Sequence, residues 1–209
     1  MLTNNITKLS RKKSDIKYIV VHYTANYNIG ANKESHYKYF NNPTAKASAD
    51  VVIDSKGILK INDWYKSYCW HVGDGKGKYG ITNSNSIGIE LCVNKDGILS
   101  ETIKKCENYI VDLLKKEFTN LSLKDIVRHY DASRKLCPAF FVDLTIKGYN
   151  KAYTDFRKNI ESKLSQTKDY KTILKEVSNY SEIWVSFVKA HPEVNLSGLI
   201  EMLYYYKSN

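Results

Sequence analysis

Two histidines and one cysteine carry the side chains that a catalytic zinc ion prefers. His22 and His129 each end a run of apolar and β-branched residues, and Cys137 follows His129 after eight positions. Two imidazoles and one thiolate leave the fourth tetrahedral position of zinc open for water, as catalysis requires. Spacing alone does not exclude structural roles, because a single histidine near the end of a strand usually has one.

The elements that must position these residues are buried strands. Asp15–Tyr23 is rich in β-branched and aromatic residues and predicts a strand that ends beside the first histidine. Ser86–Val93 predicts another buried strand, and Ile126–His129 a short one that leads into the loop Tyr130–Pro138. The three candidate ligands therefore lie at or just beyond strand ends.

Helices alternate with these strands. Lys33–Phe40 predicts a short helix, Glu101–Phe118 a longer one capped by Ser100, and Tyr149–Leu164 a third, with Phe156 and Ile160 on one face. A hairpin is predicted over residues 48–61, with Lys56 and Gly57 in its turn. This alternation favours a mixed α/β domain over residues 1–165.

The pattern changes after a polar joint at Ser165–Asp169. Residues 167–209 predict two or three short helices, with Pro192 as a breaker. So short a segment cannot build much core by itself. We expect a small helical module that docks on the first domain, forms a homo-oligomer or binds a partner, for which a cell wall is one candidate.

The net charge of +10 lies entirely on residues 1–166, because residues 167–209 contain five lysines and five acidic residues. A basic domain indicates a polyanionic partner, which could be nucleic acid, membrane or a wall that carries teichoic acid. No stretch approaches the roughly 18 apolar residues of a membrane span. Met1–Asp15 lacks the apolar segment of a secretory signal, which predicts synthesis in the cytoplasm.

Four cysteines occur without CxxC pairing. In a protein made in the cytoplasm, buried thiols or a metal ligand are expected rather than disulfides. Cys69, Cys92 and Cys106 are therefore predicted to lie in the core.

Five short blocks occur in the order and at the separations of one enzyme family. They are YIVVHYTAN, ASADVVID, WHVG, NSIGIELC and RHYDASRKLCP, at Tyr18–Asn26, Ala47–Asp54, Trp70–Gly73, Asn85–Cys92 and Arg128–Pro138. Together they resemble the type-2 N-acetylmuramoyl-L-alanine amidases, which include phage lysins, wall-recycling amidases and the peptidoglycan recognition proteins. The resemblance spans roughly residues 16–140. It implies a central mixed β-sheet flanked by helices.

The resemblance also implies the roles of five residues. One zinc ion would be bound by His22, His129 and Cys137, while Glu90 would position and deprotonate its water. Lys135 would stabilise the oxyanion. These roles agree with the chemistry, since a carboxylate can pass a proton to the leaving amine and an ammonium group offsets negative charge.

His71 opens the glycine-rich loop Gly73–Gly80. The family resemblance places this segment beside the substrate groove, so His71 is a candidate substrate contact. His36, on the helix predicted at Lys33–Phe40, is expected to be a bystander.

Two positions set this chain apart within the family. Ala49-Asp50 stands where many relatives have Tyr-His or Ala-His, so a tyrosine that assists catalysis in some members is absent and any contribution of Asp50 is open. Cys137 differs from the aspartate usual in the recycling branch. It also argues against the recognition proteins that only bind, because these lose the cysteine ligand.

These features predict a zinc-dependent endolysin that hydrolyses the amide between N-acetylmuramic acid and L-alanine in peptidoglycan. Made without a signal peptide, it would reach the wall through a holin pore, with anionic wall polymers as further partners. The alternative is a non-catalytic peptidoglycan-binding module of the same fold. A nucleic-acid-binding protein is a third hypothesis, but no helix-turn-helix, RNP motif or zinc-finger spacing supports it.

Overall fold

The computed structural model describes residues 1–145 and 150–178, except for the side chains of residues 166–178. The chain divides into two compact units, residues 1–161 and residues 162–209. All strands of the described residues lie in the first unit. None of the described helices is long and apolar enough to cross a membrane.

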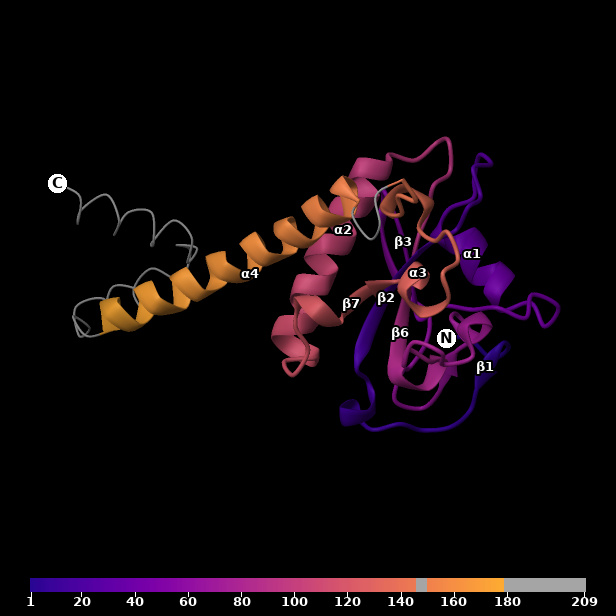
Figure 1. Ribbon diagram of the computed structural model, residues 1–209, viewed down its shortest axis with the longest axis horizontal. Coiled ribbons are helices and arrows are strands. Elements are labelled where there is room, and N and C mark those ends of the chain that lie inside the picture. The colour runs from indigo at the N-terminus through magenta and orange to yellow at the C-terminus, as the bar shows by residue number, and fades with distance from the viewer. Residues whose placement is uncertain (146–149, 179–209) are drawn as a thin grey trace, which may run out of the picture. The chain divides into compact units, whose positions relative to one another are not determined.

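A five-stranded mixed sheet forms the centre of the first unit (Figure 1). β3, β6, β2 and β7 are parallel in that order, and β4 pairs with β3 in the antiparallel sense. The central strands are buried along almost their whole length, as is usual for parallel strands covered on both faces. The strands are β2 (Tyr18–Tyr23), β3 (Val51–Asp54), β4 (Gly57–Lys60), β6 (Ser86–Leu91) and β7 (Ile126–Arg128).

Helices accompany the sheet, and in the view of Figure 1 its strands lie between α2 and α1. α1 contacts β3 and β4, and α2 packs on β3, β4 and β6. The predicted mixed α/β fold with a central mixed sheet is therefore confirmed. The helices are α1 (Lys33–Phe40), α2 (Leu99–Asp112), α3 (His129–Ser133) and α4 (Lys151–Ser178), and a π-helical segment, Leu113–Glu117, extends α2.

Smaller elements complete the first unit. β1 (Ile6–Thr7) and β5 (Tyr68–Cys69) form a two-stranded antiparallel sheet that the sequence analysis did not predict. Cys69, Cys92 and Cys106 are buried, which confirms their predicted place in the core. Short 3-10 helices occupy Lys13–Asp15, Gly73–Gly75, Asn83–Asn85, Leu123–Asp125 and Ala139–Phe141.

Three local predictions were wrong by a small margin. α2 begins at Leu99 with Ile98 as its N-cap, so Ser100 lies inside the helix instead of capping it. The turn of the β3–β4 hairpin is Ser55–Lys56, one residue earlier than predicted, so Gly57 already belongs to β4. The segment after β7 begins with the helix α3 rather than a loop. Asp131 explains this helix, because its carboxylate accepts hydrogen bonds from the backbone N–H and the guanidinium of Arg128.

The predicted end of the third helix at Leu164 is also wrong, because α4 runs without interruption from Lys151 to Ser178. The division into a catalytic domain and a small helical module stays a prediction. The joint was predicted from polarity, but this stretch contains no glycine or proline, and polar residues alone do not end a helix. Phe156 and Ile160 are buried, as predicted. Residues 179–209, which hold most of the predicted helical module, lie outside the described residues.

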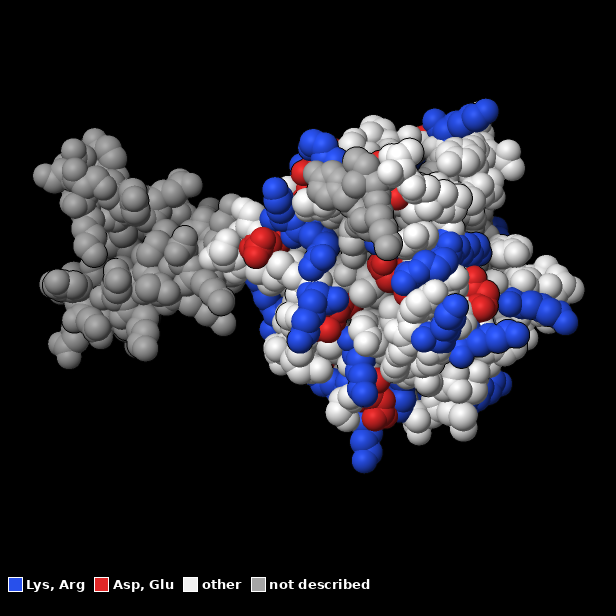
Figure 2. All heavy atoms as spheres, in the orientation of Figure 1, with Lys and Arg blue, Asp and Glu red and all other residues white. Residues whose placement is uncertain are grey.

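Basic side chains are spread over the face of the first unit that Figure 2 shows, with acidic side chains among them. On that face they do not join into the single basic stripe typical of a nucleic-acid groove. The basic side chains of this face are thus dispersed rather than gathered in one patch.

Candidate metal centre

His22, His129 and Cys137 meet at the carboxyl edge of the parallel strands. His22 is the penultimate residue of β2, His129 begins α3 directly after the neighbouring β7, and Cys137 lies in the loop beyond α3. One potential ligand atom from each of the three lies within 4.8 Å of the others, and all three residues are buried. Parallel pairing of β2 with β7 brings these distant positions together.

The contacts among the three side chains leave room for an ion. Cys137 Sγ lies 3.8 Å from Nδ1 of His22, and the rings of His22 and His129 are 4.7 Å apart between centroids. His129 Nδ1 is buried and has no hydrogen-bond partner among the described residues. Buried nitrogens rarely stay unpaired, so this atom indicates a missing ligand. The nitrogen–nitrogen–sulfur set fits Zn²⁺.

Asp74 holds the other nitrogen of His129. Its Oδ1 lies 2.8 Å from His129 Nε2, and its Oδ2 accepts a hydrogen bond from the hydroxyl of Ser133. The sequence analysis missed Asp74 because it treated the glycine-rich segment only as a loop. A histidine that binds a metal often donates its other ring N–H to a carboxylate. An acidic residue in the loop after His71 could therefore have been predicted to play this part.

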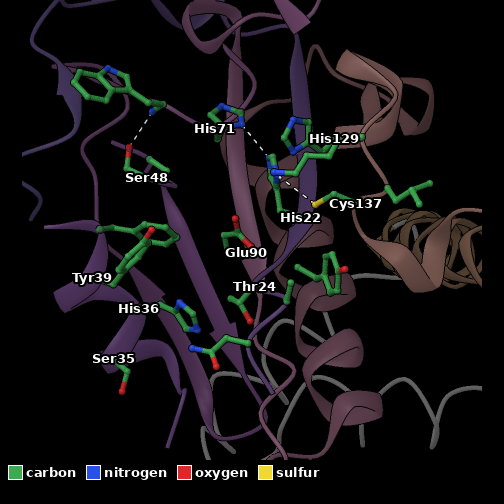
Figure 3. Close-up of a pocket in the computed structure, with 18 residues that line it drawn as sticks. His22, Thr24, Ser35, His36, Tyr39, Ser48, His71, Glu90, His129 and Cys137 are labelled. Carbon is green, nitrogen blue, oxygen red and sulfur yellow. Dashed lines mark hydrogen bonds between the residues drawn. The ribbon is translucent and has the colours of Figure 1, made fainter. Parts of the chain in front are cut away.

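A pocket of about 450 Å³ opens beside these residues (Figure 3). Its lining includes the three candidate ligands together with Glu90, Lys135, His71 and residues of α1. His36, expected to be a bystander, is buried in this lining and its Nε2 has no partner among the described residues. Its position on α1 gave no sign of this, because only packing turns that helix face toward the pocket.

Glu90 faces the pocket from β6, where it pairs in register with His22 of β2. Its Oε2 is buried and has no hydrogen-bond partner within the described part of the chain. Burial raises the pKa of Glu90 to about 7, and the positive charge of Lys135 opposes that rise. A carboxyl group that changes protonation near neutral pH is suited to taking and returning a proton.

Lys135 is exposed in the loop before Cys137 and lines the same pocket. Its charge lowers the pKa of His22, although burial and the neighbouring histidines contribute more to that shift. The ammonium group thus lies close enough to the site to affect the charge of a buried candidate ligand. The structure places both predicted catalytic side chains, Glu90 and Lys135, around one cavity with the three candidate ligands.

His71 is buried beside His22 and lines the pocket. Both of its ring nitrogens already have partners: Nδ1 is 3.0 Å from Nε2 of His22, and Nε2 is 3.2 Å from the hydroxyl of Ser86. Its predicted contact with substrate stays a prediction.

Asp50 is completely buried and does not line the pocket. Its carboxylate accepts hydrogen bonds from the backbone N–H of Gly88 and the side-chain amide of Asn62, and the Arg11 guanidinium lies 4.0 Å away. Burial raises the pKa of Asp50, against the opposing effect of Arg11 and these hydrogen bonds. At this position the chain therefore has an acid that stabilises β6 through a hydrogen bond from its backbone.

Comparison with known proteins points to one family. Residues 12–140 match the family model described as N-acetylmuramoyl-L-alanine amidase. The chain is 34% identical over 179 residues to the N-acetylmuramoyl-L-alanine amidase BlyA of Bacillus subtilis, a match that covers 78% of this chain and 46% of BlyA. The chain spans about half the length of the curated relatives that it matches.

Solved structures agree with that match. The catalytic domain of XlyA, an amidase of Bacillus subtilis, superposes with a TM-score of 0.63 at 30% identity, covering 77% of this chain and 94% of that domain. A mutant endolysin from Bacillus subtilis superposes with a TM-score of 0.60 at 31% identity, covering 76% of this chain and 90% of the endolysin.

Proposed function

Because the chain belongs to the N-acetylmuramoyl-L-alanine amidase family, we propose that it hydrolyses the amide between N-acetylmuramic acid and L-alanine in bacterial peptidoglycan. One observation carries the proposal: Glu90 and Lys135 line the same pocket as His22, His129 and Cys137. These five residues belong to the segment that matches the family model. Hydrolysis of an amide needs a proton acceptor, a donor to the leaving amine and a positive group near the carbonyl oxygen.

We infer that His22, His129 and Cys137 hold one zinc ion. Support comes from the donor set, the burial of all three residues and Nδ1 of His129, which has no hydrogen-bond partner in the part of the chain that the structure describes. When bound, zinc supplies Lewis acidity that polarises a carbonyl group and makes water more acidic. The three side chains must be deprotonated at their donor atoms to bind it.

The protein's own groups move the protons and offset the charge. In its carboxylate form, Glu90 takes a proton at Oε2 from the attacking water and then returns it to the leaving nitrogen. Lys135 offers an ammonium group to the negative charge that develops on the carbonyl oxygen. Burial of Glu90 keeps its pKa near the range in which it can perform both transfers.

The proposal extends to a lytic role on the cell wall. Similarity to a structure described as an endolysin supports it, as does a basic chain that would favour walls with anionic polymers such as teichoic acid.

The test is to incubate purified protein with bacterial walls and to assay new amino groups and new reducing sugar ends separately. We expect new N-terminal alanine without reducing ends, lost on treatment with a chelator and restored by zinc. New reducing ends would instead show glycan cleavage and refute the proposed reaction. Binding to walls without any new ends would favour the non-catalytic peptidoglycan-binding module.

A further inference from the structure

A line of hydrogen bonds leads away from the candidate metal centre behind His22. His22 Nε2 lies 3.0 Å from His71 Nδ1, and His71 Nε2 lies 3.2 Å from Ser86 Oγ. The Ser86 hydroxyl in turn lies 2.5 Å from the backbone carbonyl oxygen of Thr82. His22, His71 and Ser86 are all buried. Figure 3 shows the contacts to His71 and to Cys137 meeting at the ring of His22.

The end of this line fixes the direction of every bond in it. A carbonyl oxygen only accepts, so the single hydroxyl hydrogen of Ser86 is donated to Thr82. Ser86 Oγ can then only accept from His71, which places a hydrogen on His71 Nε2. A neutral His71 therefore has a bare Nδ1 that accepts from Nε2–H of His22. Neutral His22 is left with its lone pair on Nδ1, the nitrogen that faces Cys137.

We propose that His71 and Ser86 are positioning residues that hold His22 in the tautomer required of a metal ligand. This inference rests on the zinc site of the proposed function and names two residues that support it without touching the ion. The partner of a ligand's second nitrogen sets both the tautomer and the orientation of the ring. We call this line of hydrogen bonds from His22 through His71 to Ser86 the relay. It directs the Nδ1 lone pair of His22 toward the site before any ion is bound.

The two histidine ligands reach the same tautomer by different means. Asp74 can only accept, so His129 carries its hydrogen on Nε2 and leaves Nδ1 bare. That contact is a single step to a half-exposed carboxylate, whereas His22 is held by an uncharged relay inside the protein. Both bare Nδ1 atoms belong to the trio of residues whose donor atoms converge.

β6 is built to hold the relay. Side chains two residues apart share one face of a strand, so Ser86, Gly88 and Glu90 face the same side. A Cβ atom added to Gly88 would lie 2.8 Å from Cγ of His71, so only glycine leaves space for the imidazole ring. The Asn83 side chain also accepts hydrogen bonds from the backbone N–H groups of His71 and Val72. β6 therefore carries Ser86 at the end of the relay, Gly88 against the ring of His71, and the proposed base Glu90.

The test measures zinc affinity of the full chain, by competition with a chromophoric chelator after the protein has been stripped of metal. We expect Ser86→Ala and His71→Phe to weaken zinc binding by about 10–100-fold, the usual effect of losing an outer partner of a ligand. Thr102→Val is the matched control. It also removes a buried hydroxyl that donates to a backbone carbonyl, but it lies in α2 outside the relay. Unchanged zinc affinity in both relay variants would overturn the inference.

A second measurement does not depend on how the variants fold. Long-range nitrogen-15 spectra of the unmutated, metal-free protein report which ring nitrogen of each histidine carries hydrogen. We expect hydrogen on Nε2 of both His22 and His71, and hydrogen on Nδ1 of His22 would overturn the inference. Failure of the unmutated protein to bind zinc would refute the proposed site and the relay together. Tight zinc binding without wall hydrolysis would refute the proposed reaction alone.

Discussion

Glu90 is a carboxyl group in a position where burial disfavours its charge. Its Oε2 has no hydrogen-bond partner among the described residues, and its pKa is raised to about 7. An ordinary structural glutamate at the end of a strand would be paired or solvated. The unsatisfied oxygen beside the candidate ligands instead suits a group that exchanges a proton with substrate and water.

Glu90→Gln is therefore expected to lower kcat for wall hydrolysis by about 10²–10⁴-fold, the usual contribution of a positioned acid–base group. The amide keeps the shape of the side chain but cannot take the proton, so zinc affinity and the unfolding transition should change little. Release of N-terminal alanine measures the rate, and chelator competition measures zinc. Full activity of the variant would remove Glu90 as the base.

The loop that carries Asp74 depends on a close approach to α3. Gly75 is buried against this helix, and a Cβ atom added there would lie 2.3 Å from the carbonyl oxygen of Ala132. Backbone cannot yield as a flexible side chain can, so the 3-10 helix Gly73–Gly75 sits this close only because of the glycine. The same approach brings Asp74 to His129.

We predict that Gly75→Ala destabilises the protein by about 1–3 kcal/mol through overpacking and weakens zinc binding by displacing Asp74. Gly73→Ala is the control in the same loop, because its added Cβ would meet only the side chain of Asn83 at 3.4 Å. Urea unfolding and zinc titration of both variants check this. Equal stability and equal zinc affinity of the two variants would show that neither property depends on the close approach of Gly75 to α3.

Asp54 joins the β3–β4 hairpin to the start of α1. Its Oδ1 accepts from the backbone N–H groups of Lys56 and Gly57, and its Oδ2 accepts from the backbone N–H of Lys33. The ammonium of Lys33 also contacts the carboxylate at 3.3 Å. Burial alone would raise the pKa of Asp54, but these hydrogen bonds outweigh it and the pKa is lowered.

Asp54→Asn is expected to lower the free energy of unfolding by about 1.5–3 kcal/mol at pH 7, as for hydrogen bonds to a charged group. A lowered folded-state pKa contributes stability above the unfolded-state value near 4 and loses it as the pH falls through the folded-state value. The difference from the unmutated protein should therefore shrink at acidic pH. Urea unfolding at pH 7 and pH 3 tests this. The control is Asp112→Asn, which changes an exposed acid in α2 and should alter the free energy of unfolding little at either pH.

Across the whole molecule, positive charge is abundant but dispersed over the face seen in Figure 2. Because residues 167–209 are neutral by composition, any attraction of the chain to polyanions would come from residues 1–166. Such a surface supports long-range attraction to an anionic wall without a dedicated groove.

We therefore expect binding to walls that carry teichoic acid to weaken as salt rises from about 0.01 M to 0.15 M, since the screening length falls from roughly 30 Å to 8 Å over that range. Walls stripped of anionic polymers should bind less protein and show little dependence on salt. Sedimentation of walls with bound protein measures both. Equal binding to the two kinds of wall at low salt would argue against the polyanion as a partner.

Much of the fold could be predicted from local patterns. Buried strands and amphipathic helices depend on residues that are neighbours in the sequence, so β2, β6 and α1 were predicted nearly at their observed bounds. The failures were also local, since polarity at Ser165–Asp169 does not end a helix when no glycine or proline is present. The family motifs supplied the roles of the three candidate ligands. They also supplied the catalytic roles of Glu90 and Lys135.

The sequence by itself thus determined which side chains were available: zinc-type donors at strand ends, an acid in a buried strand and a lysine beside the cysteine. Only the tertiary structure decided how they are supported. Asp74 reaches His129 across 55 positions, and His71 reaches His22 across 49. Such contacts arise from the parallel pairing of strands and from the space left by Gly75 and Gly88, which no periodic pattern records. Donor chemistry belongs to each residue alone, whereas a tautomer depends on the partner that packing supplies.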